Sequence, residues 1–263
     1  MELIGYIASI LIGISLGLIG GGGSILTVPI LVYLFKVDAE HATSYSLCIV
    51  GITSLVGSIR HYTLGNLQIK SALIFAIPSV LTLLLVRKIV LPLIPQHLFD
   101  IGSLEIAKNN LIMVVFAVLM IMASLSMIKK NKLNNVITTP NPTRLISIGL
   151  LVGLVTGFLG AGGGFLIIPA LLFFAGLSMK QAVGTSLLII FINSTIGFAG
   201  DVINGVQLDI KLLFTVLAMA IIGMMIGTQL SKKIDGAILK PIFGWFVLVM
   251  GIFIVGKELL FNH

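Results

Sequence analysis

Gly20-Gly21-Gly22-Gly23-Ser24 interrupts an apolar stretch in the first half of the chain, and Gly160-Ala161-Gly162-Gly163-Gly164 interrupts another in the second half. Each run is followed by a short apolar segment and a proline, and these prolines, Pro29 and Pro169, are 140 residues apart. Consecutive glycines free backbone groups that lipid cannot satisfy, so in a membrane such a break should line a cavity inside the protein. Paired breaks in duplicated halves are typical of the binding site of a secondary transporter.

The composition indicates a protein that crosses a membrane several times. Of its 263 residues, 58% are hydrophobic and only 10% are charged, which is more apolar than a soluble core needs. Met1 is followed by neither a basic segment nor a small-residue cleavage site, so we expect the first helix to stay in the mature protein. The apolar stretches that reach or approach the length of a span run roughly over 3–35, 42–59, 71–94, 111–128, 145–175, 182–200, 211–230 and 237–256.

The net charge of +7 does not indicate a nucleic-acid partner. The basic residues lie mainly at the ends of apolar stretches and in loops, where positive charge sets membrane orientation. Cys48 is the only cysteine, so no disulfide forms within the chain, and a single thiol in an apolar run is typical of a packing residue. No residues have the spacing of metal ligands or of a catalytic set, so we expect neither a cofactor nor an enzyme.

Two apolar stretches, 3–35 and 145–175, are too long for one ordinary span. Each contains a glycine run and should form two helical pieces, which gives ten pieces, five in each half. The fold class is therefore all-α integral membrane, and residues 92–110 should lie along the membrane interface. The chain divides into a first transmembrane repeat at 1–128, a cytoplasmic linker at 129–144 and a second transmembrane repeat at 145–263.

The two halves are an internal repeat. Placing Gly13 on Gly153 and continuing without gaps to Gly65 on Gly205 gives 16 identities in 53 positions. Apolar segments resemble one another by chance, but glycine and proline pairs in a fixed register do not arise so easily. The alignment therefore predicts a duplication.

Loop charges predict that the repeats have opposite orientations. The linker 129–144 carries four basic residues and no acid, which places it in the cytoplasm. The loop with Arg60 and Lys70 in the first half matches a loop with Asp201 and Asp209 in the second. This exchange of charge favours inverted topology with both termini outside.

One charged pair disagrees with that orientation, because Arg87-Lys88 would approach the outer face. The other ionisable residues of interest, His41, His61 and Asp201, fall at helix ends, where we expect solvated or snorkelling side chains.

A helix that restarts after glycines presents bare N–H groups and a positive dipole end, which together bind anions. Two such ends, at 24–25 and 164–165, would form one central anion site. The alternative for a glycine is close helix packing, which we expect for Gly13, Gly153 and Gly223, whereas consecutive glycines cover every face of a helix. The predicted ligands from the two breaks are Gly21, Gly22, Gly23, Ser24, Gly162, Gly163 and Gly164.

Small polar residues begin the helix that follows each break, and an asparagine lies further along the second of these helices. In a membrane helix, serine and threonine usually bond their own backbone or a neighbouring helix. Their recurrence at equivalent positions beside the breaks favours a shared site, and an asparagine is costly to leave unpaired in lipid. The predicted binding residues from these helices are Ser46, Thr185, Ser186 and Asn193.

The doubled motif, with Gly184-Thr185-Ser186 after the second copy, resembles the TauE/SafE family of membrane permeases over essentially the whole chain. The resemblance implies a multi-pass plasma-membrane transporter that exports sulfite or small organosulfonates such as sulfoacetate. The first half departs from the second by having Ser44-Tyr45-Ser46 in place of Gly-Thr-Ser.

The sequence thus favours a secondary transporter that exports a small anion by alternating access, with the anion bound mid-membrane at the paired glycine breaks. Its partners are the lipid bilayer and a small anionic substrate. A coupling ion (a proton or sodium) and a homo-oligomer stay open. An anion channel would use the same helix-end chemistry and is the alternative function, whereas an intramembrane enzyme would need a reactive set of side chains.

Overall fold

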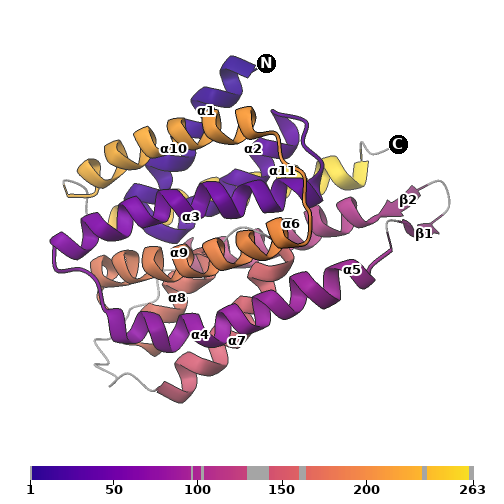
Figure 1. The fold of residues 1–263 in the computed structure, drawn as a ribbon. Coiled ribbons are helices and arrows are strands. Elements are labelled where there is room, and N and C mark those ends of the chain that lie inside the picture. The colour runs from indigo at the N-terminus through magenta and orange to yellow at the C-terminus, as the bar shows by residue number, and fades with distance from the viewer. Residues whose placement is uncertain are drawn as a thin grey trace.

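The computed structural model describes residues 2–95, 97–101, 104–128, 142–159, 164–232 and 236–260, most of them in helices (Figure 1). The first half contains α1 (Glu2–Ile19), a 3-10 helix η1 (Gly20–Leu26), α2 (Thr27–Tyr33), α3 (Ala39–Thr63), α4 (Ile69–Leu85), a π-helical turn η2 (Val86–Val90), α5 (Leu91–Leu93), strands β1 (His97–Ile101) and β2 (Leu104–Ala107), and α6 (Lys108–Ile128). The second half contains α7 (Pro142–Leu159), α8 (Gly164–Phe174), α9 (Met179–Ile203), α10 (Ile210–Leu230) and α11 (Gly236–Leu260).

The described helices support a multi-pass membrane protein. Four are long and apolar enough to cross a bilayer: Ala39–Thr63, Ile69–Leu93, Met179–Ile203 and Ile210–Leu230. The second of these joins α4, η2 and α5 into one continuous helical segment. The prediction of a helical, multi-pass membrane protein is confirmed.

The helices pair between the two halves of the chain. In Figure 1, α3 and α9 run side by side through the middle, with α10 above and α4 and α7 below. α1 packs against α10, α4 against α7, and α6 against α11. The first helix of each half thus packs against the long fourth helix of the other half.

Glycines make these contacts close. A Cβ added to Gly13 of α1 would lie 1.9 Å from the carbonyl oxygen of Ala220 on α10. On the matching α4–α7 contact, a Cβ on Gly153 would lie 2.1 Å from the oxygen of Ser79. Both distances are far below van der Waals contact, so only glycine permits these separations. The packing role predicted for Gly13 and Gly153 is confirmed.

The backbone repeats with the same offset of 140 residues as the sequence. Lys36 and Gly176 both have positive φ, at 60° and 63°, and so do Gly65 and Gly205, at 71° and 85°. The next helix starts alike in both halves, because the side chains of Asp38 and Ser178 cap α3 and α9 by accepting a backbone N–H three residues on.

The first helix of the chain turns back on itself at the glycine run. The ring of Tyr6, near the start of α1, packs at 5.6 Å between centroids against Phe35, which follows α2. α1 and α2 therefore form a V whose tip is η1 and whose two open ends lie together. The tip of the V contacts α8 and α9 of the second half, while α1 packs along α10.

Residues 92–110 differ from the all-α expectation of the sequence. β1 and β2 form an antiparallel hairpin there, beside α6 in Figure 1. The helix α7 begins at Pro142, within the segment 129–144 that the sequence predicts as a linker. Most of the linker, 129–141, lies outside the described residues.

Candidate functional site

The two glycine breaks meet inside the bundle. A Cβ added to Gly21 of η1 would lie 2.3 Å from the Cα of Gly164, the first residue of α8. A Cβ added to Gly164 would likewise lie 2.3 Å from the Cα of Gly21. The backbones therefore touch directly, at a crossing where neither chain has room for a side chain. We call this contact the glycine crossing.

The first break is a tight helix and not an open end. Residues 20–26 form the 3-10 helix η1, which supplies most of its own backbone acceptors, and the N–H of Thr27 donates to the oxygen of Ser24. The N–H of Gly21, at the start of the break, donates to the Ser186 hydroxyl of α9 at 3.5 Å. The Ser24 hydroxyl donates to the Gly21 oxygen at 2.7 Å. The predicted bare amides at 24–25 are thus partly satisfied, because a glycine-rich segment can coil more tightly than an α-helix.

The second break contributes Gly164, which begins α8 at the glycine crossing. Gly162 and Gly163, which the sequence also predicts as ligands, lie outside the described residues, as do Gly160 and Ala161. Gly22 and Gly23 belong to η1. The predicted glycine ligands that the structure describes therefore come together at one place.

The predicted polar residues on α9 are all fully buried. The Ser186 hydroxyl donates to the Val183 oxygen at 2.8 Å, which leaves it as an acceptor for Gly21. The Thr185 hydroxyl accepts from the N–H of Gln68 at 3.0 Å. The Asn193 amide donates to the Ser79 hydroxyl at 2.7 Å. These bonds join α9 to the first half of the chain.

Several buried polar atoms have no partner within the described residues. They lie on the helices around the glycine crossing, and each side chain is fully buried. An unpaired buried hydroxyl or amide costs free energy, and such atoms need a water or a ligand. The atoms are Thr27 Oγ1, Ser46 Oγ, Ser54 Oγ, Asn193 Oδ1 and Ser194 Oγ.

The sequence missed a buried ion pair between the two halves. Arg87 of η2 donates from Nε to Asp201 Oδ1 at 2.6 Å and from Nη2 to Asp201 Oδ2, a two-pronged contact with both side chains buried. Nη2 also reaches the hydroxyls of Thr43 and Ser44, at 3.2 and 3.0 Å, and Nη1 donates to the Gly157 oxygen at 3.3 Å.

The expectation of a solvated Asp201 at a helix end is wrong, because α3, η2 and α7 cover the end of α9. His61 is also buried, at 4% exposure. The sequence signal that could have found the pair is Arg87 itself, a cation inside an apolar stretch, where an ionisable residue normally has a partner. Its contact with Asp201 also explains why Arg87 does not follow the charge rule for loops.

α3 and α9 run in opposite directions, so each end of the bundle combines the start of one helix with the end of the other. The two ends carry different charged residues. Asp201, late in α9, meets Ser44, early in α3, and Gly184, early in α9, meets His61, late in α3. We call the end with Asp38, Asp201 and Asp209 the acidic end, although it also carries the exposed Lys36, Lys88 and Lys211. The basic end presents exposed cations and, within the described residues, no acid; these cations include Arg60, Lys70, Lys180 and Lys232.

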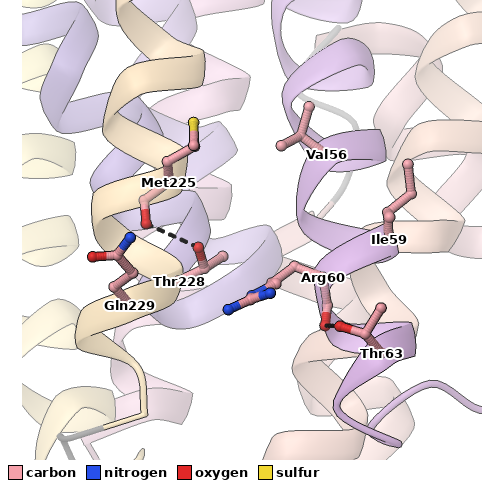
Figure 2. A pocket seen from close by; sticks show the side chains of 7 residues that line it. All are labelled: Val56, Ile59, Arg60, Thr63, Met225, Thr228 and Gln229. Carbon is pink, nitrogen blue, oxygen red and sulfur yellow. Dashed lines mark hydrogen bonds between the residues drawn. The ribbon is translucent and has the colours of Figure 1, made fainter.

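A pocket of about 360 Å³ opens at the basic end between α3 and α10. Figure 2 shows the Arg60 side chain extending from α3 toward Thr228 and Gln229 of α10. The rest of the lining is largely apolar, from residues such as Val56, Ile59 and Met225. A cation in this position favours the approach of an anion from that end.

The sequence model of the family described as sulfite exporter TauE/SafE matches residues 6–254. The chain belongs to the TauE/SafE family. It is similar to a probable membrane transporter protein of Xylella fastidiosa, at 29% identity over 94% of this chain and 92% of the relative. It also resembles the probable membrane transporter protein YdhB of Bacillus subtilis, at 29% identity over 88% of this chain and 90% of YdhB.

The TauE/SafE assignment identifies the chain as a multi-pass membrane transporter. These names describe transport and not catalysis. The glycine crossing and the unpaired polar atoms around it are therefore candidate parts of a transport site.

Proposed function

We propose that the protein is a secondary transporter that exports a small anion, a sulfur oxyanion or organosulfonate such as sulfite or sulfoacetate, across the plasma membrane. The observation that carries the proposal is the contact of the two glycine breaks, Gly21 against Gly164. Backbone amides and neutral hydroxyls in a dry site stabilise an anion without a resident cation. The family description, which names sulfite, supports the choice of substrate.

The site would lie between inverted repeats that rock against each other. Three observations support this arrangement: the exchange of partners between α1–α10 and α4–α7, the opposite directions of α3 and α9, and the 140-residue offset in backbone geometry. The basic end would face the cytoplasm. Arg60 would then meet the anion as it arrives from inside the cell.

Binding and flux measurements test the proposed function. Calorimetry with the purified protein should detect sulfite, sulfoacetate or thiosulfate, and valine at Gly22 should abolish the binding. Proteoliposomes should show saturable anion flux that an opposing gradient of the same anion can drive. Flux that never saturates would instead favour a channel, and binding that survives the Gly22 change would place the site elsewhere.

Removal of an unpaired hydroxyl near the glycine crossing should weaken anion binding without destabilising the fold. Thr27→Val keeps the shape of the side chain and removes an oxygen with no partner in the described protein. We expect a loss of affinity of about tenfold, the effect of about 1.4 kcal/mol, because one neutral hydrogen bond to the anion is lost. The thermal midpoint should stay the same or rise.

Thr156→Val is the matched control for this change. Thr156 is equally buried, but its hydroxyl donates to its own helix at Val152. We expect unchanged affinity for the control. Equal affinities for both variants and the unaltered protein would remove Thr27 from the site.

A further inference from the structure

The Arg87–Asp201 pair is a costly feature for a membrane protein. Both side chains are buried in helices that are apolar enough to span a bilayer, where an isolated charge is strongly disfavoured. All three nitrogens of the guanidinium have partners, and the Asp201 carboxylate also accepts from the Ser44 hydroxyl at 2.6 Å. A cation held this way must always have an anion beside it.

The pair joins the two halves that the proposed mechanism moves apart. Arg87 and its hydroxyl partners Thr43 and Ser44 belong to the first half, and Asp201 and the Gly157 carbonyl belong to the second. Opening of the acidic end by motion of one half against the other would therefore have to break these contacts. The pair holds that end closed.

The basic end has no equivalent pair within the described residues, although the chain is duplicated. The offset of 140 residues makes His61 the equivalent of Asp201 and Gly184 the equivalent of Ser44. Along α4 and α10 the matched contacts, Gly13 with Ala220 and Gly153 with Ser79, give an offset of 141, which makes Thr228 the equivalent of Arg87. The His61 ring has no hydrogen-bond partner in the described part of the chain, and the Thr228 hydroxyl donates to the oxygens of Met224 and Met225 in its own helix. The ion pair is thus a specialisation of one end and not a by-product of the repeat.

The guanidinium of Arg87 offers a parallel pair of donors, from Nε and Nη2, to two oxygens of one group. A carboxylate fits this fork, and so does any small oxyanion with two oxygens on one atom, such as a sulfonate or sulfite. We propose that Arg87 is a second anion-binding site, at which the transported oxyanion displaces the Asp201 carboxylate and thereby opens the acidic end. The inference rests on the proposed function.

The exchange keeps the buried charge balanced. While Asp201 is bound, its carboxylate neutralises Arg87. When the oxyanion replaces it, Asp201 moves toward the water at the acidic end and one anionic group of the oxyanion, the sulfonate in sulfoacetate, neutralises the same guanidinium; a second anionic group stays toward that water. No covalent bond is made or broken and no proton is transferred. After the oxyanion leaves, Asp201 returns to Arg87 and the end closes.

Cys48 provides a natural probe of this opening. It is the only cysteine of the chain, and its thiol is buried. It follows Ser44 by four residues on α3, so it lies on the same face one turn deeper than the ion pair. A membrane-impermeant thiol reagent on the acidic side should reach it only when that end opens.

The experiment measures the rate of Cys48 labelling in sealed vesicles, with the reagent on the acidic side and sulfoacetate as the probe anion. We expect sulfoacetate to speed labelling of the unaltered protein about tenfold. Asp201→Asn should label at the fast rate without sulfoacetate, because a neutral amide binds the Arg87 guanidinium more weakly than the carboxylate does. Arg87→Lys should lose the response, because a lysine has no fork. Asp209→Asn, a change at the same end but outside the pair, should behave as the unaltered protein.

Slow labelling of Asp201→Asn, or a full sulfoacetate response in Arg87→Lys, would overturn the inference. Calorimetry on the same samples separates it from the proposed function: sulfoacetate that binds without speeding labelling refutes only the exchange, whereas failure to bind refutes both. Should Asp201→Asn fail to fold, the double change Arg87→Leu with Asp201→Leu removes both charges. It should label fast with or without sulfoacetate, and slow labelling would again overturn the inference.

Discussion

Gly21→Ala is expected to abolish anion binding while most of the protein still folds. The added Cβ would lie 2.3 Å from the Cα of Gly164, and the atoms it meets are backbone, which cannot rotate away. The two glycine breaks must therefore separate. We expect overpacking to cost about 1–3 kcal/mol of stability and the displaced crossing to lower sulfoacetate affinity beyond detection. Thermal unfolding and calorimetry on the same sample would measure the two effects.

Gly13→Ala is the control that separates packing from binding. Its Cβ would meet the Ala220 oxygen at 1.9 Å on the α1–α10 contact, an equally tight place away from the glycine crossing. It should lose a similar amount of stability and keep its affinity in the folded fraction. If both variants lose affinity equally, the crossing has no special role and the effect belongs to helix packing in general.

The sequence predicted the helical membrane class and the position of the first break because these depend on local composition. Apolar stretch lengths determine spans, and four consecutive glycines end a regular α-helix at Ile19, as observed. The 3-10 form of η1 was not predictable from the sequence. Glycine permits many backbone conformations, and the contacts of η1 with α8 and α9 determine which one it adopts. In this form the amide that donates to the second half is that of Gly21, bonded to Ser186, and not one at 24–25.

The long-range partners were not predictable from one sequence. Arg87 and Asp201 are 114 residues apart, and only the packing of α4 beside α9 brings them together. The position of Arg87 was a sign of this pairing, because it contradicted the orientation that the loop charges predict. The hairpin of β1 and β2 was missed for another reason: apolar and polar residues alternate only over two three-residue runs, Phe99–Ile101 and Leu104–Ile106, which are too short to stand out between helical stretches.

Arg87→Leu is expected to be among the most destabilising single substitutions in the chain. It leaves the Asp201 carboxylate buried without its counter-charge, and removal of one partner from a buried pair typically costs about 3–5 kcal/mol. The Gly157 oxygen and the Thr43 hydroxyl lose a donor as well. We expect the thermal midpoint of the detergent-purified protein to fall by about 10 °C, as measured by size-exclusion chromatography after heating.

The double variant Arg87→Leu with Asp201→Leu should recover most of this loss, because two apolar side chains replace both charges and none is left unpaired. Arg60→Leu is the control for the loss of a cation: Arg60 is exposed at the basic end, so its removal should change stability by no more than about 0.5 kcal/mol. A double variant as unstable as the single one would mean that the introduced leucines fail to pack and that charge is not the cause. Recovered stability together with Cys48 labelling that stays fast with or without sulfoacetate would show that the pair serves transport and that the fold does not require it.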